Sequence, residues 1–167
     1  MNGLRSIRIK NTRHWRFATE ADFRRVFKEE INSLFLLAAV LTTDIAKAEE
    51  CFCRALDSSL NALWVSAERA GPWARRAVVS QAVQLVAPRK GCTQCPIASG
   101  FVWPETSNLG NPVATLCSLN PFERFVVVMT LLERQSDFDC ALQLECTRQD
   151  VGVARASALR KLCESCQ

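Results

Sequence analysis

The stretch from Phe23 to Leu41, FRRVFKEEINSLFLLAAVL, decides the fold of this chain, because its apolar residues recur at steps of three and four. That spacing stacks side chains along one face of an α-helix, whereas a strand would scatter them over both of its faces. Thr19 and Asp22 form a capping pair, which predicts that the helix begins there. The buried face is expected to comprise Phe23, Val26, Phe27, Ile31, Leu34, Phe35, Ala38 and Leu41.

The same periodicity resumes after each of two interruptions. Thr42 to Asp44 ends the first pattern and caps a second helix. Gly71-Pro72 then precedes a third helix, which runs from Trp73 to Val86. Residues 19–87 are therefore predicted to form a first helical module. Its second helix should bury Ile45, Ala48, Phe52, Leu56, Leu60 and Leu63.

The composition changes between Pro88 and Pro112, where four prolines and three glycines give neither helical nor strand periodicity. A patternless stretch of about 25 residues is unusual inside one compact domain. We therefore expect residues 88–115 to be a flexible linker between two modules.

The second module is predicted to be a unit of three helices. Capping signatures at Asn120, Ser136 and Thr147 open these helices, and a tight turn joins the last two. Such a turn is typical of a helix-turn-helix. The fold class is thus all-α, with two small helical modules. The predicted ranges are 116–163 for the module and 137–145 and 148–162 for its last two helices, and the expected buried residues are Phe122, Phe125, Val126, Met129, Leu132, Cys140, Ala141, Leu144, Val151, Ala158 and Leu162.

The composition argues against an enzyme. The chain has 167 residues, of which 21 are Lys or Arg and 17 are Asp or Glu, with one His, no Tyr and a net charge of +4. Few side chains that transfer protons near neutral pH are therefore present, and we predict no catalytic residue. His14 lies alone in residues 1–18, a basic arm expected to be mobile. This arm is interpreted as a solvated tail or, alternatively, as a segment that touches a polyanion.

Cysteine usage and hydropathy indicate a cytoplasmic protein. An odd count of nine cysteines in a chain of this length does not fit a disulfide framework, so we expect reduced thiols. The basic N-terminus is followed by no long apolar core, which argues against a signal peptide. The longest apolar run, Leu34 to Leu41, is less than half of the ~20 residues that span a membrane. We therefore expect no membrane insertion.

Two Cys-x-x-Cys pairs, Cys92 with Cys95 and Cys163 with Cys166, leave two further hypotheses open. Four thiolates would suit zinc, and a bond between the pairs would make a redox switch. The pairs lie far apart in sequence, so we assign no metal and no cofactor and expect free thiols.

Several of these segments resemble a bacterial extracytoplasmic-function (ECF) sigma factor of the sigma-70 family. Leu41 to Glu50, LTTDIAKAEE, matches the region 2 pattern LT-x-D-x-x-x-A-E-D, and a helix opening with Trp73 follows as in that family. Leu119 to Arg124, LNPFER, resembles the L-P-x-x-E-R opening of region 4, and Ser136 to Leu144 matches its next helix. Two motifs in the correct order, across a linker of suitable length, carry more weight than either alone.

The resemblance implies a transcription initiation factor that binds core RNA polymerase and directs it to promoter DNA. It implies no reaction catalysed by the factor itself, and it leaves open an anti-sigma factor as a further partner. By this resemblance Glu49 and Glu50 would contact the polymerase. The implied DNA-binding residues are Trp73, Arg75, Arg76, Arg148, Gln149 and Arg155.

The helix expected to read DNA departs from the family pattern. Gly152, Val153 and Ala154 stand where the family usually has Lys-Ser-Arg. Glu145 stands where a Gly usually begins a turn that needs a left-handed backbone. These departures motivate an alternative hypothesis, a degenerate sigma-like protein-interaction module without sequence-specific DNA recognition.

Overall fold

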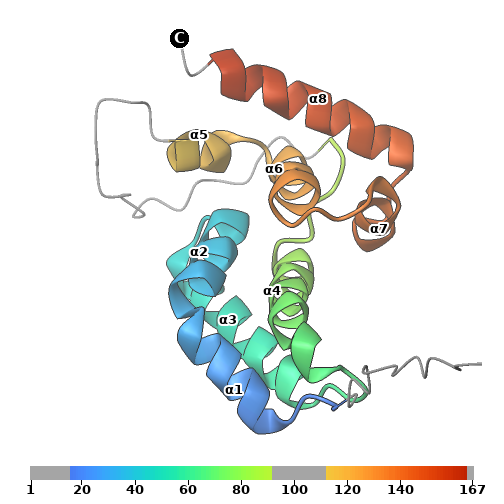
Figure 1. Ribbon diagram of the computed structural model, residues 1–167. Helices are drawn as coiled ribbons and strands as arrows, with labels where there is room; N and C mark the ends of the chain where they lie inside the picture. The colour runs from blue at the N-terminus through green and yellow to red at the C-terminus, as the bar shows by residue number, and fades with distance from the viewer. Residues whose placement is uncertain (1–15, 92–111, 165–167) are drawn as a thin grey trace, which may run out of the picture.

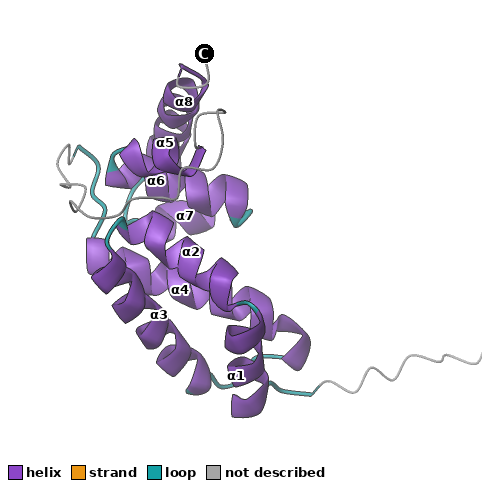
Figure 2. Ribbon diagram, turned by 90° about the vertical axis from the view of Figure 1, so that its left-hand side faces the viewer, coloured by secondary structure: helices purple, strands orange, loops and turns teal. Residues whose placement is uncertain are grey.

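The computed structural model describes residues 16–91 and 112–164, and both stretches are helical (Figure 1). The first contains α1 (Glu20–Glu29), α2 (Ile31–Thr42), α3 (Ile45–Leu60), the 3-10 turn η1 (Ala67–Arg69) and α4 (Ala70–Val86). The second contains α5 (Pro112–Ser118), α6 (Pro121–Val127), the π-helical turn η2 (Val128–Leu132), α7 (Asp137–Gln143) and α8 (Arg148–Glu164). No strand occurs within these two ranges, which confirms the all-α class (Figure 2).

The predicted first helix is two helices, because the chain breaks at Glu30 between α1 and α2. The expected cap at its start is confirmed, since Thr19 and Asp22 form a reciprocal capping box. The break turns the start of α2 outward, so Ile31, expected to be buried, is 49% exposed. The rest of α2 buries side chains on more than one face, which is typical of a helix enclosed by protein.

Three other residues expected to be buried are also exposed, and each lies at a helix end. Ile45 is the first residue of α3, and Leu63 follows the end of that helix. Leu132 closes η2, where the wider π-helical turn changes the register of the predicted face. Apolar periodicity locates the buried face inside a helix, but it overruns the helix ends.

The two halves of the chain share one core, contrary to the expectation of two tethered modules. A single cluster of buried side chains includes Leu41 and Val78 from the first half and Phe125 and Met129 from the second. In the first half α2, α3 and α4 pack on one another, and in the second α6 and α7 pack on α8. α2 also contacts α5 and α6, so this helix of the first half packs against the second half (Figure 1).

A buried arginine ties the halves together. Arg124 is 2% exposed and donates hydrogen bonds to the carbonyl oxygens of Cys117 at 3.1 Å and Leu119 at 3.0 Å. Its guanidinium also donates to the carbonyl oxygen of Leu41, in the last turn of α2, at 3.3 Å. Carbonyls in the last turn of a helix have no partner within it, so a buried cation satisfies them.

Residues at the edges of the expected arm and linker are structured. Phe17 pairs with Ser66 in an isolated antiparallel bridge, so the end of the arm lies against the loop after α3. α5 begins at Pro112, inside the range expected to be linker. Residues 1–15, including His14, and residues 92–111 lie outside the described part of the chain.

Candidate nucleic-acid interface

An open cleft of about 1030 Å³ lies between the two halves of the molecule. One wall comes from the N-terminal segment, the loop after α3 and the start of α4, and the other from residues 132–136 and the first turn of α7. Three of the residues implied by the resemblance to contact DNA, Trp73, Arg75 and Arg76, line this cleft together.

The cleft carries an excess of positive charge. Five arginines line it, against the two carboxylates of Glu133 and Asp139. Among the described residues, three of these arginines form no ion pair or hydrogen bond through their side chains, and all three are exposed. The three unpaired arginines are Arg69, Arg76 and Arg134. Unpaired guanidinium groups facing one hollow attract phosphate or another polyanion.

Aromatic side chains are interleaved with these arginines. Trp64 is 80% exposed, and its ring meets that of Phe17 edge to face at a centroid distance of 5.3 Å. Trp73, which begins the expected helix, is 39% exposed on the same cleft. Exposed indole rings beside arginines are the features that stack on unpaired nucleic-acid bases.

Two cleft residues have a left-handed backbone although neither is glycine. The φ angle is 69° at Trp64 and 52° at Arg134. A bulky side chain in this region is strained, and such strain persists where the surroundings hold it. Trp64 lies on one wall of the cleft and Arg134 on the other, so each wall contains one residue with this strained backbone.

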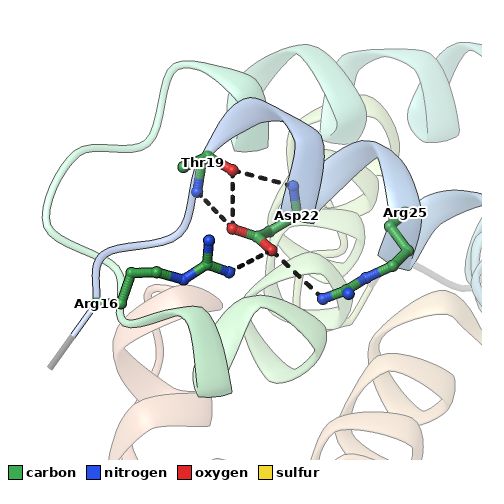
Figure 3. A network of polar contacts seen from close by, with 4 residues as sticks. All are labelled: Arg16, Thr19, Asp22 and Arg25. Carbon is green, nitrogen blue, oxygen red and sulfur yellow. Dashed lines mark hydrogen bonds and ion pairs between the residues drawn. The ribbon is translucent and has the colours of Figure 1, made fainter. Parts of the chain in front are cut away.

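A carboxylate network fixes the wall that carries Phe17 (Figure 3). Asp22 accepts a hydrogen bond from the backbone N–H of Thr19 at 2.9 Å and from its hydroxyl at 2.8 Å. The guanidinium of Arg16 donates to the other oxygen of Asp22 at 2.8 Å, and that of Arg25 at 3.4 Å. These contacts, those of Thr19 first, lower the pKa of Asp22 to about 2. The ionised carboxylate thus holds the segment before α1 in place.

The same segment is hydrogen-bonded to the loop that carries Trp64. The N–H of Ala18 donates to the carbonyl of Val65 at 2.6 Å, and the N–H of Ala67 donates to the carbonyl of Arg16 at 2.8 Å. Phe17 and Trp64 are therefore positioned by paired backbone on both sides.

Arg75 is engaged across the cleft, unlike its neighbour Arg76. Its Nε donates to Glu133 Oε2 at 2.9 Å and its Nη2 to Glu133 Oε1 at 2.6 Å, a two-bond pair between α4 and the residue after η2. Its Nη1 donates to the hydroxyl of Ser33 at 2.8 Å. Glu133 raises the pKa of Arg75 through this pair. All three guanidinium nitrogens therefore have protein partners.

The residues implied on the recognition helix lie on α8, outside this cleft. Arg148 and Gln149 are exposed in its first turn. Arg155 is bound to Asp137, with Nη2 3.1 Å from Oδ2, and this contact lowers the pKa of Asp137. Of the six residues implied to bind DNA, the structure brings three into the cleft, and the other three stay on α8.

The turn between α7 and α8 has the left-handed backbone expected there, although the residue is not glycine. Glu145 has a φ of 51°, which is the left-handed backbone that the turn needs. Gly152 lies inside α8, and a Cβ built on it would meet no atom within 4 Å. Gly152, Val153 and Ala154 have no polar side-chain atoms, so this segment presents little polar surface.

The two acidic residues implied to contact polymerase are exposed on α3. Glu49 and Glu50 are adjacent on that helix, and Glu50 forms an ion pair with Arg54 one turn later. They do not line the cleft, so these two acidic residues and the cleft lie on separate surfaces.

The cysteines of the described residues are thiols in apolar surroundings or lie singly at the surface. Burial raises the pKa of Cys51 and of Cys140 to about 12, so neither is a reactive thiolate at neutral pH. Within residues 16–91 and 112–164, no three His, Cys, Asp or Glu side chains form a cluster that could hold a metal. Of the two Cys-x-x-Cys pairs only Cys163 is described, and it is exposed; Cys92, Cys95 and Cys166 lie outside the described residues.

Comparison with known proteins assigns no relative. A scan of the chain against protein-family models finds no match, and a search of curated proteins finds none either. Within the described residues no helix combines the length and apolar character needed to cross a membrane.

Half of the cleft was not predicted from the sequence. Trp64, Arg69 and Arg134 carry its exposed aromatic and unpaired charge, and Glu133 engages Arg75. A signal for Trp64 was present, since a large aromatic residue lies in the short non-helical stretch between two predicted helices. No sequence signal places Arg134 beside it, because these positions are 70 residues apart and meet only through the packing of the halves.

Proposed function

We propose that this protein is a sigma-like transcription initiation factor whose cleft binds single-stranded promoter DNA. The supporting observation is the group of exposed aromatic rings and unpaired arginines on the cleft, with Trp64 as its most exposed ring. Stacking on an aromatic ring accepts any base, and arginines supply contacts to the phosphates between bases. A duplex hides its base faces, so this surface favours an opened strand.

In this proposal, polymerase and DNA bind to separate surfaces of the molecule. Glu49 and Glu50 on α3 would contact a basic surface of core RNA polymerase, outside the cleft. The cleft would then hold the strand that opening of the promoter exposes. No step of this function needs a catalytic side chain.

Binding of labelled oligonucleotides tests the cleft directly. The full chain is titrated against a fluorescein-labelled single strand of 12 to 15 nucleotides and against the matching duplex, with anisotropy as the readout. We expect the single strand to bind at least about tenfold more tightly, because one stacked base contributes roughly 1–3 kcal/mol. Equal affinity for both forms would refute a base-stacking cleft.

Polymerase binding separates the proposal from the alternative. Purified core RNA polymerase is mixed with the chain, and both complex formation and run-off transcription are measured. Promoter-selective transcripts support an initiation factor. The alternative, a degenerate interaction module, is favoured by the apolar Gly152 to Ala154 segment on α8 and predicts a complex without selective transcripts. In a variant with Glu49→Gln and Glu50→Gln, both hypotheses predict weaker polymerase binding and unchanged oligonucleotide binding.

A further inference from the structure

We infer that the ion pair between Arg75 and Glu133 is a latch that ties the two walls of the cleft together, and that nucleic acid must release this latch to gain Arg75 as a phosphate ligand. This inference rests on the proposed function and adds how the binding site is regulated. Arg75 and Arg76 are adjacent on α4, but Arg75 is bound to a carboxylate whereas Arg76 is exposed.

Arg75 and Arg76 differ in how much of their charge is available. Arg76 is exposed and has no ion-pair partner among the described residues. Arg75 uses both nitrogens of one edge on Glu133 and its third nitrogen on Ser33, with Glu30 at 4.0 Å as a second carboxylate. A phosphate binds arginine through the same nitrogens, so it has to displace Glu133.

Glu133 cannot be displaced from Arg75 without a movement of the chain, because its carboxylate is buried. The side chain of Glu133 is only 7% exposed, so it cannot exchange Arg75 for water where it stands. An ionised carboxylate left buried without a cation is strongly unfavourable. Release of Arg75 therefore carries Glu133, and the segment after η2 that holds it, away from α4. That segment is one wall of the cleft, with Leu132, Arg134 and Gln135 beside Glu133.

Latch and ligand are thus coupled. While the ion pair is formed, it joins the two walls of the cleft and keeps Arg75 from binding phosphate. A bound strand stabilises the state with the latch released only by the contacts that this state adds, and the contact added here is the guanidinium of Arg75. Removal of the charge on Glu133 should therefore tighten binding, which is the opposite of the effect of removing a residue that contacts the ligand.

The test compares two substitutions that each remove one negative charge from the cleft. Glu133→Gln removes the latch carboxylate, whereas Asp139→Asn removes the other cleft carboxylate, which bonds to Ser136 and not to an arginine. Both variants are titrated with a labelled single-stranded oligothymidylate at one fixed ionic strength. We expect Glu133→Gln to bind about fivefold more tightly than the wild type and Asp139→Asn to change affinity by less than about twofold. Equal gains would overturn the latch, because they would show a general charge effect.

A double substitution assigns the gain to Arg75. In the chain carrying both Arg75→Gln and Glu133→Gln, the tighter binding should disappear, since no released cation remains. If the gain persists in this chain, Arg75 is not the group that the latch withholds, and the inference is wrong.

A second variant covers the case in which Glu133→Gln does not fold. Arg75→Lys keeps the charge but cannot form the two-bond pair, so it weakens the latch without leaving Glu133 unpaired. It should bind the oligothymidylate more tightly than the wild type, and equal or weaker binding would overturn the latch.

A measurement without ligand separates this inference from the proposed function. Amide hydrogen exchange in residues 128–136 should be faster in Arg75→Lys and Glu133→Gln than in the wild type or Asp139→Asn. Faster exchange with no oligonucleotide binding by any chain would refute the nucleic-acid cleft and leave the latch standing. Oligonucleotide binding with unchanged exchange would refute the latch and leave the cleft standing.

Discussion

Two surfaces of the molecule carry exposed arginines, the cleft between the halves and the outer face of α8, and they differ in what surrounds those arginines. On the cleft, Arg69, Arg76 and Arg134 have no ion-pair partner among the described residues and lie beside exposed tryptophan. On α8, Arg155 is bound to Asp137, Arg148 and Arg160 are exposed with no ion pair among the described residues, and the turn before Arg155 offers Gly152 and Val153. Unpaired arginines beside exposed aromatic rings offer a strand both phosphate contacts and base stacking. These exposed rings are the reason that we propose the cleft, rather than α8, as the surface that binds a strand.

The largest expected effect is a loss of stability in the shared core that holds the two halves of the cleft together. Arg124→Met removes the buried guanidinium and leaves the carbonyls of Leu41 and Leu119 without this donor. We expect the free energy of unfolding to fall by roughly 3 kcal/mol, in one cooperative urea transition followed by circular dichroism. Arg54→Met, at an exposed ion pair on α3, should change it by less than about 0.5 kcal/mol. Two separate transitions in the wild-type chain would contradict a shared core.

Substitution of the exposed tryptophan sharpens the comparison. Trp64→Ala removes the stacking surface of the cleft and should weaken binding of a single-stranded oligonucleotide about tenfold. Phe138→Ala is the matched control, because Phe138 is an exposed aromatic residue on α7 that does not line the cleft. Its affinity should equal that of the wild type. The reverse ranking would move the binding surface to the helix-turn-helix.

The salt dependence of binding distinguishes a free arginine from an engaged one. Arg76→Gln should lower the slope of log affinity against log salt by about 0.7, the value of one phosphate contact on a single strand. Arg155→Gln should leave this slope unchanged, because Arg155 is bound to Asp137. Titrations at four or more salt concentrations measure both slopes. A change for Arg155→Gln equal to that for Arg76→Gln would place α8 in the interface.

Acid should loosen the cleft wall that Asp22 fixes. The pKa of Asp22 is lowered to about 2 in the folded chain from an ordinary 3.8, so its ionised form stabilises the fold. That contribution is complete above the ordinary value and is lost as the pH falls from about 3.8 toward 2. The stability difference between the wild type and Asp22→Asn should therefore shrink over this range in urea titrations at successive pH values. A difference that stays constant would contradict the role of the carboxylate.

The smallest expected effect concerns α8 alone. Gly152→Ala should raise the free energy of unfolding by about 0.5–1 kcal/mol, because alanine favours helix and its Cβ would meet no atom. Oligonucleotide affinity should stay the same. Gly91→Ala is the contrasting control, since the φ of 82° at Gly91 strains any side chain and should make that variant less stable. A loss of binding in Gly152→Ala would show that the start of α8 touches the strand closely.

The sequence predicted local features well because they depend on neighbours in the chain. The caps at Thr19, Asn120 and Ser136 form as expected, since each side chain reaches a backbone N–H three residues on. The left-handed turn at Glu145 was also predicted, from the position that a helix-turn-helix gives it. The break at Glu30 was not, because apolar residues continue at helical spacing through it.

The candidate site was predicted only in the part that lies on one helix. Trp73, Arg75 and Arg76 are near one another in the chain, so a motif could group them. The amino-acid sequence did not indicate which of the candidate arginines are free to bind a ligand. Arg75 is engaged by Glu133, 58 residues away, and Arg155 is engaged by Asp137, 18 residues away. Both pairs form only when helices from distant parts of the chain pack together.

What the sequence alone determined is the helical class, the caps and most of the buried faces, because these follow from apolar spacing and side chains within a few residues of one another. The tertiary structure decided that the two halves share a core, that Arg124 is buried between them, and that Trp64 and Arg134 face one cleft. The physical reason is that burial and ion pairing depend on which surfaces meet. In this chain those surfaces come from residues far apart in sequence, and only the packed helices bring them together.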